Sequence, residues 1–254
     1  MNQSKPPTKH RGTAAVHLQG IFKQFRDDES SLPVLENVTF SVPNQRFVCL
    51  IGPSGSGKST LLRIVAGLLQ PDDGTVQFAN SHTLSMVFQN FALFPWLTVE
   101  QNIGFGLRMS QISAVKRDRL VREHIAEMGL AGFEHQHPRE LSGGMKQRVG
   151  IARALTMQPD ILLMDEPFSS LDALTAEKLR QEVLEVWHRD QMTIVMVTHL
   201  IEEAVELADE IIVFSPRPGR IVKTIPIDLP RPRNRRSAAF YKLVDALAGY
   251  IVAE

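Results

Sequence analysis

The sequence predicts an α/β fold, because segments with strand-like and helix-like hydrophobic patterns alternate along the chain. Three short apolar runs, at 161–164, 193–197 and 211–214, are typical of parallel strands that are buried on both faces. A glycine-rich segment at 52–57 separates a strand-like run from a run with helical spacing. Together these patterns predict a sheet in which parallel strands dominate.

The first half of the chain is expected to be rich in strands. The predicted strands lie at 16–20, 37–42, 46–51, 74–78 and 83–88. Pro43 and Asn44 mark the turn before the third of them. The helix that follows the glycine-rich segment has Leu61 and Val65 on one face and should end near Gly67.

The second half adds a helical insertion and the three buried strands. From 99 to 128 the apolar spacing becomes helical, and we expect a helical subdomain at about 90–150, inserted in a domain that spans 16–230. Residues 1–15 are expected to form a flexible tail. A basic, proline-containing run at 231–236 should begin a C-terminal extension, 231–254. Its arginines are expected to be solvated, and binding to anionic lipid headgroups is the alternative.

Composition excludes several classes of protein. The 254 residues are 43% hydrophobic and 22% charged, which is ordinary for a globular chain. Lys plus Arg and Asp plus Glu are 28 each, so a net charge of zero argues against a nucleic-acid partner. Cys49 is the single cysteine, which excludes an intrachain disulfide. The longest apolar run, Phe47–Ile51, is far shorter than the roughly 20 residues that a membrane-spanning helix needs.

The strongest motif is a glycine-rich loop between a strand and a helix, which is the setting of a phosphate-binding loop. Glycines allow backbone N–H groups to turn toward phosphate oxygens, and the helix start adds a partial positive charge. We expect Lys58 to reach the β- and γ-phosphates of a nucleotide and the Ser59 hydroxyl to ligate Mg²⁺. The nucleotide-binding residues of this motif are Gly52, Pro53, Ser54, Gly55, Ser56, Gly57, Lys58, Ser59 and Thr60.

Two further motifs accompany the loop. The apolar run at 161–164 ends in Asp165 and Glu166, at the carboxyl edge where α/β sheets bind ligands. Asp165 should hold Mg²⁺ through water, and Glu166 should polarise the attacking water. Ser142, Gly143 and Gly144 precede a cation-rich helical stretch and are expected to form a second helix-start anion site, although taken alone they also fit an ordinary N-cap with a flexible turn.

With these motifs, the chain resembles the ATP-binding cassette family over about residues 16–225. The loop at 52–59 looks like the Walker A motif, 161–166 like Walker B, and 141–145 like the family signature LSGGQ. The resemblance implies a P-loop ATPase fold with a mixed sheet core, an antiparallel β subdomain and an inserted α-helical subdomain. It also implies ATP and Mg²⁺ as ligands.

The resemblance assigns roles to residues outside these motifs. Gln89 stands at the Q-loop position and is expected to contribute to catalysis and to the Mg²⁺ site. Asp172 matches the D-loop, and Phe25 matches the aromatic residue that stacks on adenine. His199 matches the switch histidine. The catalytic residues implied are therefore Glu166, His199, Gln89 and Lys58.

A few positions depart from the family pattern. Met145 replaces the signature glutamine, and Phe25 replaces the more usual tyrosine. Leu200 follows His199 where aspartate is frequent. Gln45 stands where a turn glycine is common, and we expect Asn44 to take the left-handed conformation there. None of these changes removes a group with a catalytic role.

The resemblance implies an assembly as well. One ATP-binding subunit would pair head to tail with a second copy, so that each Ser142 loop caps the ATP held by the other. The transmembrane permease subunits would be separate chains, and a periplasmic solute-binding protein would act indirectly. The chain would then be a peripheral protein on the cytoplasmic face of the inner membrane. Phe94, Trp96 and Leu97 are either subdomain core or an exposed docking patch for the permease.

Alternatives within the superfamily differ in their insertions. A DNA-maintenance ATPase would carry long coiled coils or zinc-binding cysteines between the motifs, whereas this sequence has a single cysteine. A translation factor would carry two cassettes, whereas this sequence contains one set of the motifs. An ATPase of iron–sulfur assembly stays open. The segment at 215–221 resembles one that is common in the ATPase subunits of nitrate, sulfonate, taurine and bicarbonate importers. Importers of thiamine precursors and of amino acids are the alternatives.

Overall fold

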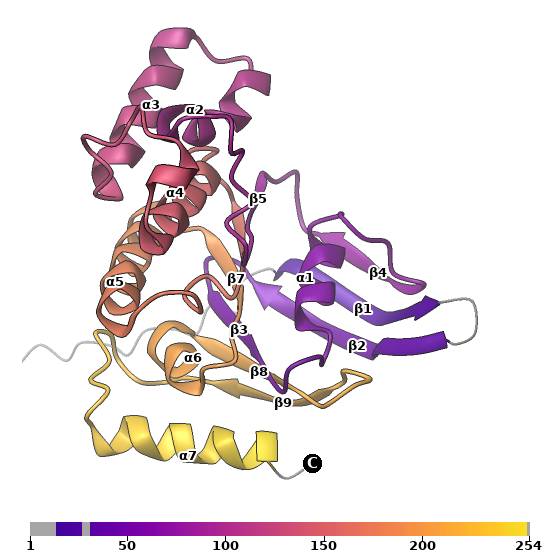
Figure 1. Ribbon diagram of the computed structural model, residues 1–254. Helices are drawn as coiled ribbons and strands as arrows, with labels where there is room; N and C mark the ends of the chain where they lie inside the picture. Colours follow the sequence, from indigo (N-terminus) through magenta and orange to yellow (C-terminus); the bar gives the residue numbers. More distant parts are fainter. Residues whose placement is uncertain (1–13, 27–30, 253–254) are drawn as a thin grey trace, which may run out of the picture.

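The computed structural model describes residues 14–26 and 31–252. The tail expected at 1–15 lies outside these residues except for its last two, which begin the first strand. Two sheets form the centre of the molecule, and a helical lobe lies beyond one end of the larger sheet (Figure 1). The α/β prediction is confirmed by this arrangement.

The smaller sheet is antiparallel, with the strand order β2-β1-β4. Its strands are β1 (Ala14–Arg26), β2 (Ser31–Pro43) and β4 (Asp73–Phe78). The first two are much longer than the segments predicted from the sequence. Shifts in register between β1 and β2 break the regular alternation of buried and exposed residues. One such irregularity surrounds Gly20, whose φ is 61°. Periodicity therefore detected only part of each strand.

The larger sheet has six strands in the order β5-β6-β7-β3-β8-β9. These strands are β3 (Phe47–Ile51), β5 (Leu84–Val87), β6 (Ile161–Asp165), β7 (Thr193–Val197), β8 (Glu210–Phe214) and β9 (Ile221–Pro226). All neighbours are parallel except β8 and β9. Every residue of β3, β6 and β7 is buried, as the continuous apolar runs predict. The edge strand β9 lacks such a run and was not predicted.

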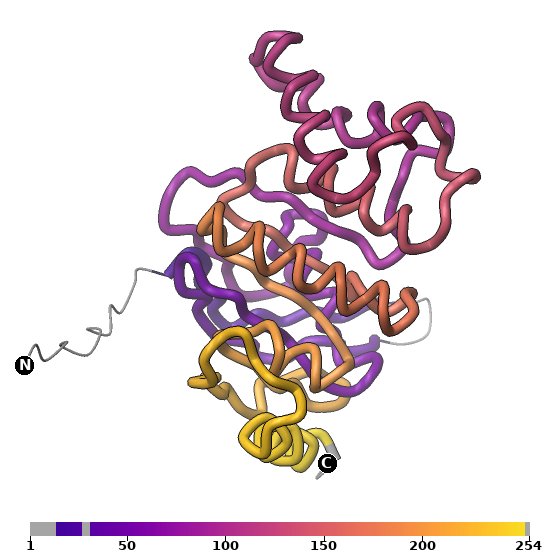
Figure 2. Tube along the Cα trace, turned by 90° about the vertical axis from the view of Figure 1, so that its left-hand side faces the viewer, coloured from indigo at the N-terminus to yellow at the C-terminus, as the bar shows by residue number. Residues whose placement is uncertain are grey.

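The helices divide into those beside the sheets and those of the lobe. Beside the sheets lie α1 (Lys58–Val65), α5 (Ala173–Asp190), α6 (Ile201–Leu207) and α7 (Ala238–Val252). The lobe contains α2 (Val99–Ile103), η1 (Gly106–Met109), α3 (Ala114–Glu127), η2 (Pro138–Glu140) and α4 (Gly143–Leu155). Thr98 and Ser113 cap α2 and α3, so the helical region predicted at 99–128 consists of separate short helices. The lobe and α7 lie at opposite ends of the molecule in both views (Figure 2).

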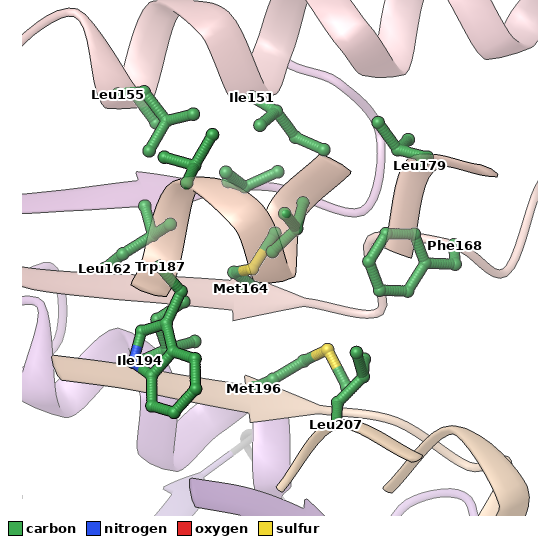
Figure 3. Close-up of a cluster of buried hydrophobic side chains, with 14 of the residues drawn as sticks. Ile151, Leu155, Leu162, Met164, Phe168, Leu179, Trp187, Ile194, Met196 and Leu207 are labelled. Carbon is green, nitrogen blue, oxygen red and sulfur yellow. The ribbon is translucent and has the colours of Figure 1, made fainter. Parts of the chain in front are cut away.

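The larger core cluster lies between the six-stranded sheet and the helices that cover it. Ile151 of α4, Leu162 of β6 and Ile194 of β7 are buried together with Trp187 of α5 (Figure 3). A second cluster fills the space between the two sheets and α1. Burial of these apolar side chains holds the carboxyl ends of β3 and β6 in fixed positions. In the described part of the chain, no helix has the length and hydropathy required to cross a bilayer.

The expectation that Asn44 takes the left-handed conformation is wrong. Gln45, and not Asn44, takes the left-handed conformation, with φ of 58°. Its N–H donates to the Thr193 hydroxyl at 2.9 Å, and this tertiary contact selects the conformation.

The arginines of the C-terminal extension are not all solvated. Arg233 donates to the carbonyl oxygens of Val205 at 2.8 Å and of Ala208 at 2.5 Å, at the end of α6. The Arg231 guanidinium lies 4.6 Å from the centre of the Trp187 ring. Burial lowers the pKa of Arg233 to about 10, with the positive charge of Arg231 acting in the same direction. These two side chains attach the extension to α6 and to Trp187 of α5.

Candidate nucleotide and catalytic site

The phosphate loop (residues 52–57) connects β3 to α1, and glycine is required at both of its ends. A Cβ on Gly52 would lie 2.6 Å from the Phe214 carbonyl oxygen. A Cβ on Gly57 would lie 2.8 Å from the Val34 carbonyl oxygen, and the φ of Gly57 is 85°. Larger residues would push the loop away from the neighbouring strands, so close packing and left-handed backbone explain the glycines.

The side chain of Lys58, the first residue of α1, extends back into this loop. Its Nζ donates to the carbonyl oxygens of Gly52 at 2.9 Å and Pro53 at 2.8 Å, and to the Ser56 hydroxyl at 2.9 Å. Burial lowers the pKa of Lys58, while the carboxylates of Glu166 and Asp165 oppose that shift. The loop thus holds the Lys58 ammonium with two carbonyl oxygens and the Ser56 hydroxyl, which keeps a positive charge inside the loop where a polyphosphate would bind.

Ser59 connects the start of α1 to the end of β6. Its hydroxyl donates to Asp165 Oδ1 at 2.7 Å. Burial raises the pKa of the Asp165 carboxyl, and the hydrogen bond from Ser59 opposes the shift. A hydroxyl and a carboxylate oxygen side by side are the hard donors that Mg²⁺ takes in proteins, so the residues present fit that ion.

Glu166 receives contacts from two other predicted site residues. Gln89 Nε2 donates to Glu166 Oε2 at 3.2 Å, and His199 Nδ1 lies 3.2 Å from the same oxygen. Glu166 has a φ of 46°, and its N–H donates to the Val197 carbonyl oxygen of β7 at 3.0 Å. A glutamate in the left-handed region is strained, and the contact with β7 holds it there.

These residues surround a cavity of about 410 Å³. The exposed ring of Phe25 lies at one side, and Lys23 Nζ is 5.8 Å from its centre. The cavity is lined by Phe25, Leu32, Val34, Ser54, Gly55, Ser56, Gly57, Lys58, Ser59, Thr60, Gln89, Glu166 and Arg217. Four predicted site residues outside the lining contact a residue within it. Asp165 contacts Ser59, His199 contacts Glu166, and the carbonyl oxygens of Gly52 and Pro53 accept from Lys58. Sequence reasoning missed Arg217, whose proline- and glycine-rich segment was interpreted only as an indicator of the transported solute.

A larger cavity, about 1060 Å³, contains none of the predicted site residues. It opens beside Gln45, Asp160 and Met192, which precede β3, β6 and β7. Ligands of open α/β sheets bind at the carboxyl ends of the strands, where the 410 Å³ cavity lies. Size alone is therefore a poor guide to the site in this chain.

Four predicted nucleotide-binding residues line a separate cavity of about 570 Å³. Ser142, Gly143 and Gly144 line it at the start of α4, and Asp172 lines it at the start of α5. The Ser142 hydroxyl accepts a hydrogen bond from the Met145 N–H at 3.3 Å. Within one chain, the predicted residues thus form two sites, and Asp172 belongs to the second.

Comparison with known proteins supports the resemblance to the ATP-binding cassette family. Residues 35–169 match the model of a family described as ABC transporter. The nitrate import ATP-binding protein NrtD of Synechocystis sp. is 42% identical over 253 residues, which cover 93% of this chain and 95% of NrtD. The aliphatic sulfonates import ATP-binding protein SsuB of Bacillus licheniformis is 45% identical over 224 residues, covering 86% of this chain and 87% of SsuB.

A solved structure is similar over most of the chain. The ATP-binding cassette MJ0796, in a dimeric post-hydrolysis state with ADP and Pi, matches with a TM-score of 0.77 and 32% identity. The match covers 85% of this chain and 100% of the MJ0796 chain. The family and fold predictions are confirmed, and the chain belongs to the ABC transporter family as an ATP-binding, ATP-hydrolysing subunit coupled to transport.

Proposed function

We propose that this chain hydrolyses ATP to drive the import of a small anionic solute. The observation that carries the catalytic part is the convergence of Gln89 and His199 on the Glu166 carboxylate beside the phosphate loop. This carboxylate is at the end of β6, within the cavity that also contains Lys58. A carboxylate there is suited to orient a water molecule for attack on the terminal phosphate.

The other residues bind and position ATP. The phosphate loop and Lys58 hold the β- and γ-phosphates, and the Phe25 ring stacks on adenine. His199 contacts the γ-phosphate and keeps Glu166 oriented. Ser59, Asp165 and Gln89 would hold Mg²⁺, which supplies positive charge to neutralise the phosphates.

A head-to-tail homodimer would give the cavity at Ser142 a role in binding ATP. The Ser142 site is suited to an anion by its helix start and glycines, yet it does not join the phosphate loop within one chain. Pairing two copies about a two-fold axis would bring each Ser142 site to the other copy's phosphate loop. The dimeric state of the similar cassette MJ0796, with ADP and Pi, supports this arrangement.

The docking patch (Phe94, Trp96 and Leu97) is suited to a permease subunit. Trp96 is 71% exposed, and its ring stands 5.7 Å from that of Phe94. An exposed tryptophan on a partly buried apolar support is typical of a protein interface. The chain would then act at the cytoplasmic face of the inner membrane, bound to separate transmembrane chains. A periplasmic binding protein would deliver the solute to them.

The domain division proposed from the sequence fits this role. Residues 16–230 would form the ATPase domain, with the helical subdomain at about 90–150 inserted, and 231–254 the extension. The extension ends in α7, which packs on α6 and β8. The solute group is proposed from relatives, since NrtD, SsuB and the bicarbonate transport protein CmpD are named for nitrate, sulfonates and bicarbonate.

The catalytic proposal is tested with Glu166→Gln and Lys58→Ala. Glu166→Gln should bind ATP with the parent affinity and lose roughly 10²-fold or more in turnover, because only water activation is removed. Lys58→Ala should lose affinity as well. Glu202→Gln, an exposed glutamate on α6, serves as the control and should hydrolyse ATP at the parent rate. Parent-like hydrolysis by Glu166→Gln would overturn the assignment.

The transport proposal needs the permease. Co-purification of the chain with its transmembrane subunits, followed by ATP-dependent uptake into vesicles, should favour nitrate, taurine, another sulfonate or bicarbonate. Uptake of a thiamine precursor or an amino acid would reject the anion part and keep the importer part.

A further inference from the structure

The turn between β8 and β9 lies directly against the phosphate loop. A Cβ on Gly219 would lie 2.0 Å from the Ser56 carbonyl oxygen, so only glycine permits this approach. The Gly219 N–H donates to the Val34 carbonyl oxygen at 2.8 Å, and the Glu36 N–H donates to the Gly219 carbonyl oxygen at 3.0 Å. The turn is therefore anchored both to β2 and to the loop.

Arg217 extends from this anchored turn along the phosphate loop. Its Nε donates to the Gly55 carbonyl oxygen at 3.3 Å. Its Nη2 would lie 3.2 Å from a Cβ on Gly55, and the side chain lines the same cavity as Phe25 and Lys58. One donor thus holds the guanidinium on the loop backbone, and the remaining N–H donors belong to a side chain that lines the cavity.

The charge of Arg217 has no counterpart in the described structure. Within residues 14–26 and 31–252, no carboxylate forms an ion pair with Arg217, whereas Arg220 of the same turn pairs with Glu36 at 2.7 Å. A cation that is held in place beside a polyphosphate site, without an acidic partner there, is suited to bind an anion.

We propose that Arg217 is a nucleotide-binding residue that contacts the phosphates of a nucleoside di- or triphosphate. The inference rests on the proposed ATPase function and adds a second cation, besides Lys58, to its binding site. Guanidinium groups bind phosphate oxygens through paired N–H donors, which fits a side chain already oriented by the Gly55 carbonyl. The contact stabilises bound nucleotide and plays no part in activating water.

The test compares Arg217→Ala with Arg220→Ala, a matched control on the same turn. Nucleotide affinity is measured by calorimetry for the purified chain with ATP and with ADP, without Mg²⁺. Arg217→Ala should weaken both affinities by about tenfold, the size expected for a lost hydrogen bond to a charged group. Arg220→Ala should keep the parent affinities, because its partner is Glu36.

Two further measurements separate a phosphate contact from other roles. Affinity of the parent chain for ATP should fall more steeply with added salt than that of Arg217→Ala, and Arg217→Lys should restore part of the affinity. In displacement of a fluorescent ATP analogue, adenosine should compete equally well against the parent and against Arg217→Ala. The thermal midpoint without nucleotide should be the same in both.

The outcomes distinguish this inference from the proposed function. If the parent chain binds no ATP, the proposed function fails. If the parent binds ATP and Arg217→Ala binds it equally well, only the role of Arg217 is overturned. An equal loss in Arg220→Ala, or an equal loss of adenosine affinity, would also reject the phosphate contact.

Discussion

The Ser59 hydroxyl donates to the Asp165 carboxylate at 2.7 Å, although the two residues are 106 positions apart in the chain. Ser59 is in the first turn of α1, and Asp165 is the last residue of β6. The parallel neighbours of the large sheet bring the ends of β3 and β6 to one edge, with β7 between them. Two donors that a divalent cation requires are thus positioned by the sheet and not by a local motif.

The first prediction concerns Mg²⁺. Asp165→Asn keeps an oxygen that can accept the Ser59 hydrogen bond but removes the negative charge. We expect the Mg²⁺ concentration for half-maximal ATP hydrolysis to rise by about tenfold or more, because a neutral amide attracts the cation and its bound water less strongly than a carboxylate. ATP binding measured without Mg²⁺ should stay within about twofold of the parent value, because the phosphate loop is unchanged.

Asp228→Asn serves as the control, since Asp228 is exposed and follows β9, away from Ser59. Its Mg²⁺ requirement should equal that of the parent chain. An unchanged requirement in Asp165→Asn would remove this carboxylate from the metal site.

The second prediction concerns the docking patch. Trp96→Asp places a charge on a side chain that is 71% exposed, so folding and ATP hydrolysis by the isolated chain should be unchanged. Co-purification with the permease should be lost, because the charge would have to be desolvated in an apolar interface. Tyr241→Asp, at an exposed aromatic residue on α7, is the matched control and should retain the permease. A lower thermal midpoint for Trp96→Asp alone would identify core packing instead.

Local patterns predicted the parts of the fold that depend on local physics. The strands β3, β6 and β7 are continuous apolar runs because both of their faces are buried. The phosphate loop was recognisable because its glycines, at a fixed spacing, occupy positions where a larger side chain would clash with neighbouring backbone.

Other features depend on contacts between residues that are far apart in the sequence, and local patterns did not predict them. The role of Arg217 depends on Gly55, a residue 162 positions away in the chain, which no local pattern indicates. Gln45, in the turn before β3, is left-handed, and its N–H donates to the Thr193 hydroxyl of β7. Arg233 belongs to a polar, proline-containing run that predicts solvent exposure, yet α6 offers it unpaired carbonyl groups.

The third prediction concerns that arginine. Arg233 binds carbonyl oxygens of Val205 and Ala208, and removing it would leave the end of α6 without these donors. We expect Arg233→Ala to lower the free energy of unfolding by about 2 kcal/mol, the size typical of hydrogen bonds to a charged group. Arg236→Ala, at an exposed position of the same run, should change stability by less than about 0.5 kcal/mol. Urea unfolding followed by circular dichroism measures both, and equal stability of the two variants would contradict the attachment role.

The last prediction concerns the two anion sites. The Ser142 site and the phosphate loop line separate cavities, of about 570 Å³ and 410 Å³. If a second copy supplies the Ser142 site, a bulky side chain at this position should block pairing sterically without affecting the chain's own loop. We therefore expect Ser142→Arg, in a Glu166→Gln background, to bind ATP and remain monomeric on gel filtration with ATP and without Mg²⁺. Glu166→Gln alone should elute as a dimer under those conditions and as a monomer without ATP.

Loss of the helix cap is a separate effect of changing Ser142, because its hydroxyl accepts the Met145 N–H at 3.3 Å. Ser142→Ala removes the same hydroxyl without adding bulk and should cost about 1 kcal/mol of stability. Since the glycines and helix start remain, Ser142→Ala should still dimerise with ATP, although more weakly. Dimerisation of Ser142→Arg at the level of Ser142→Ala would show that the Ser142 site does not face the partner's triphosphate. A monomeric Glu166→Gln at high protein concentration, with and without ATP, would reject the paired arrangement itself.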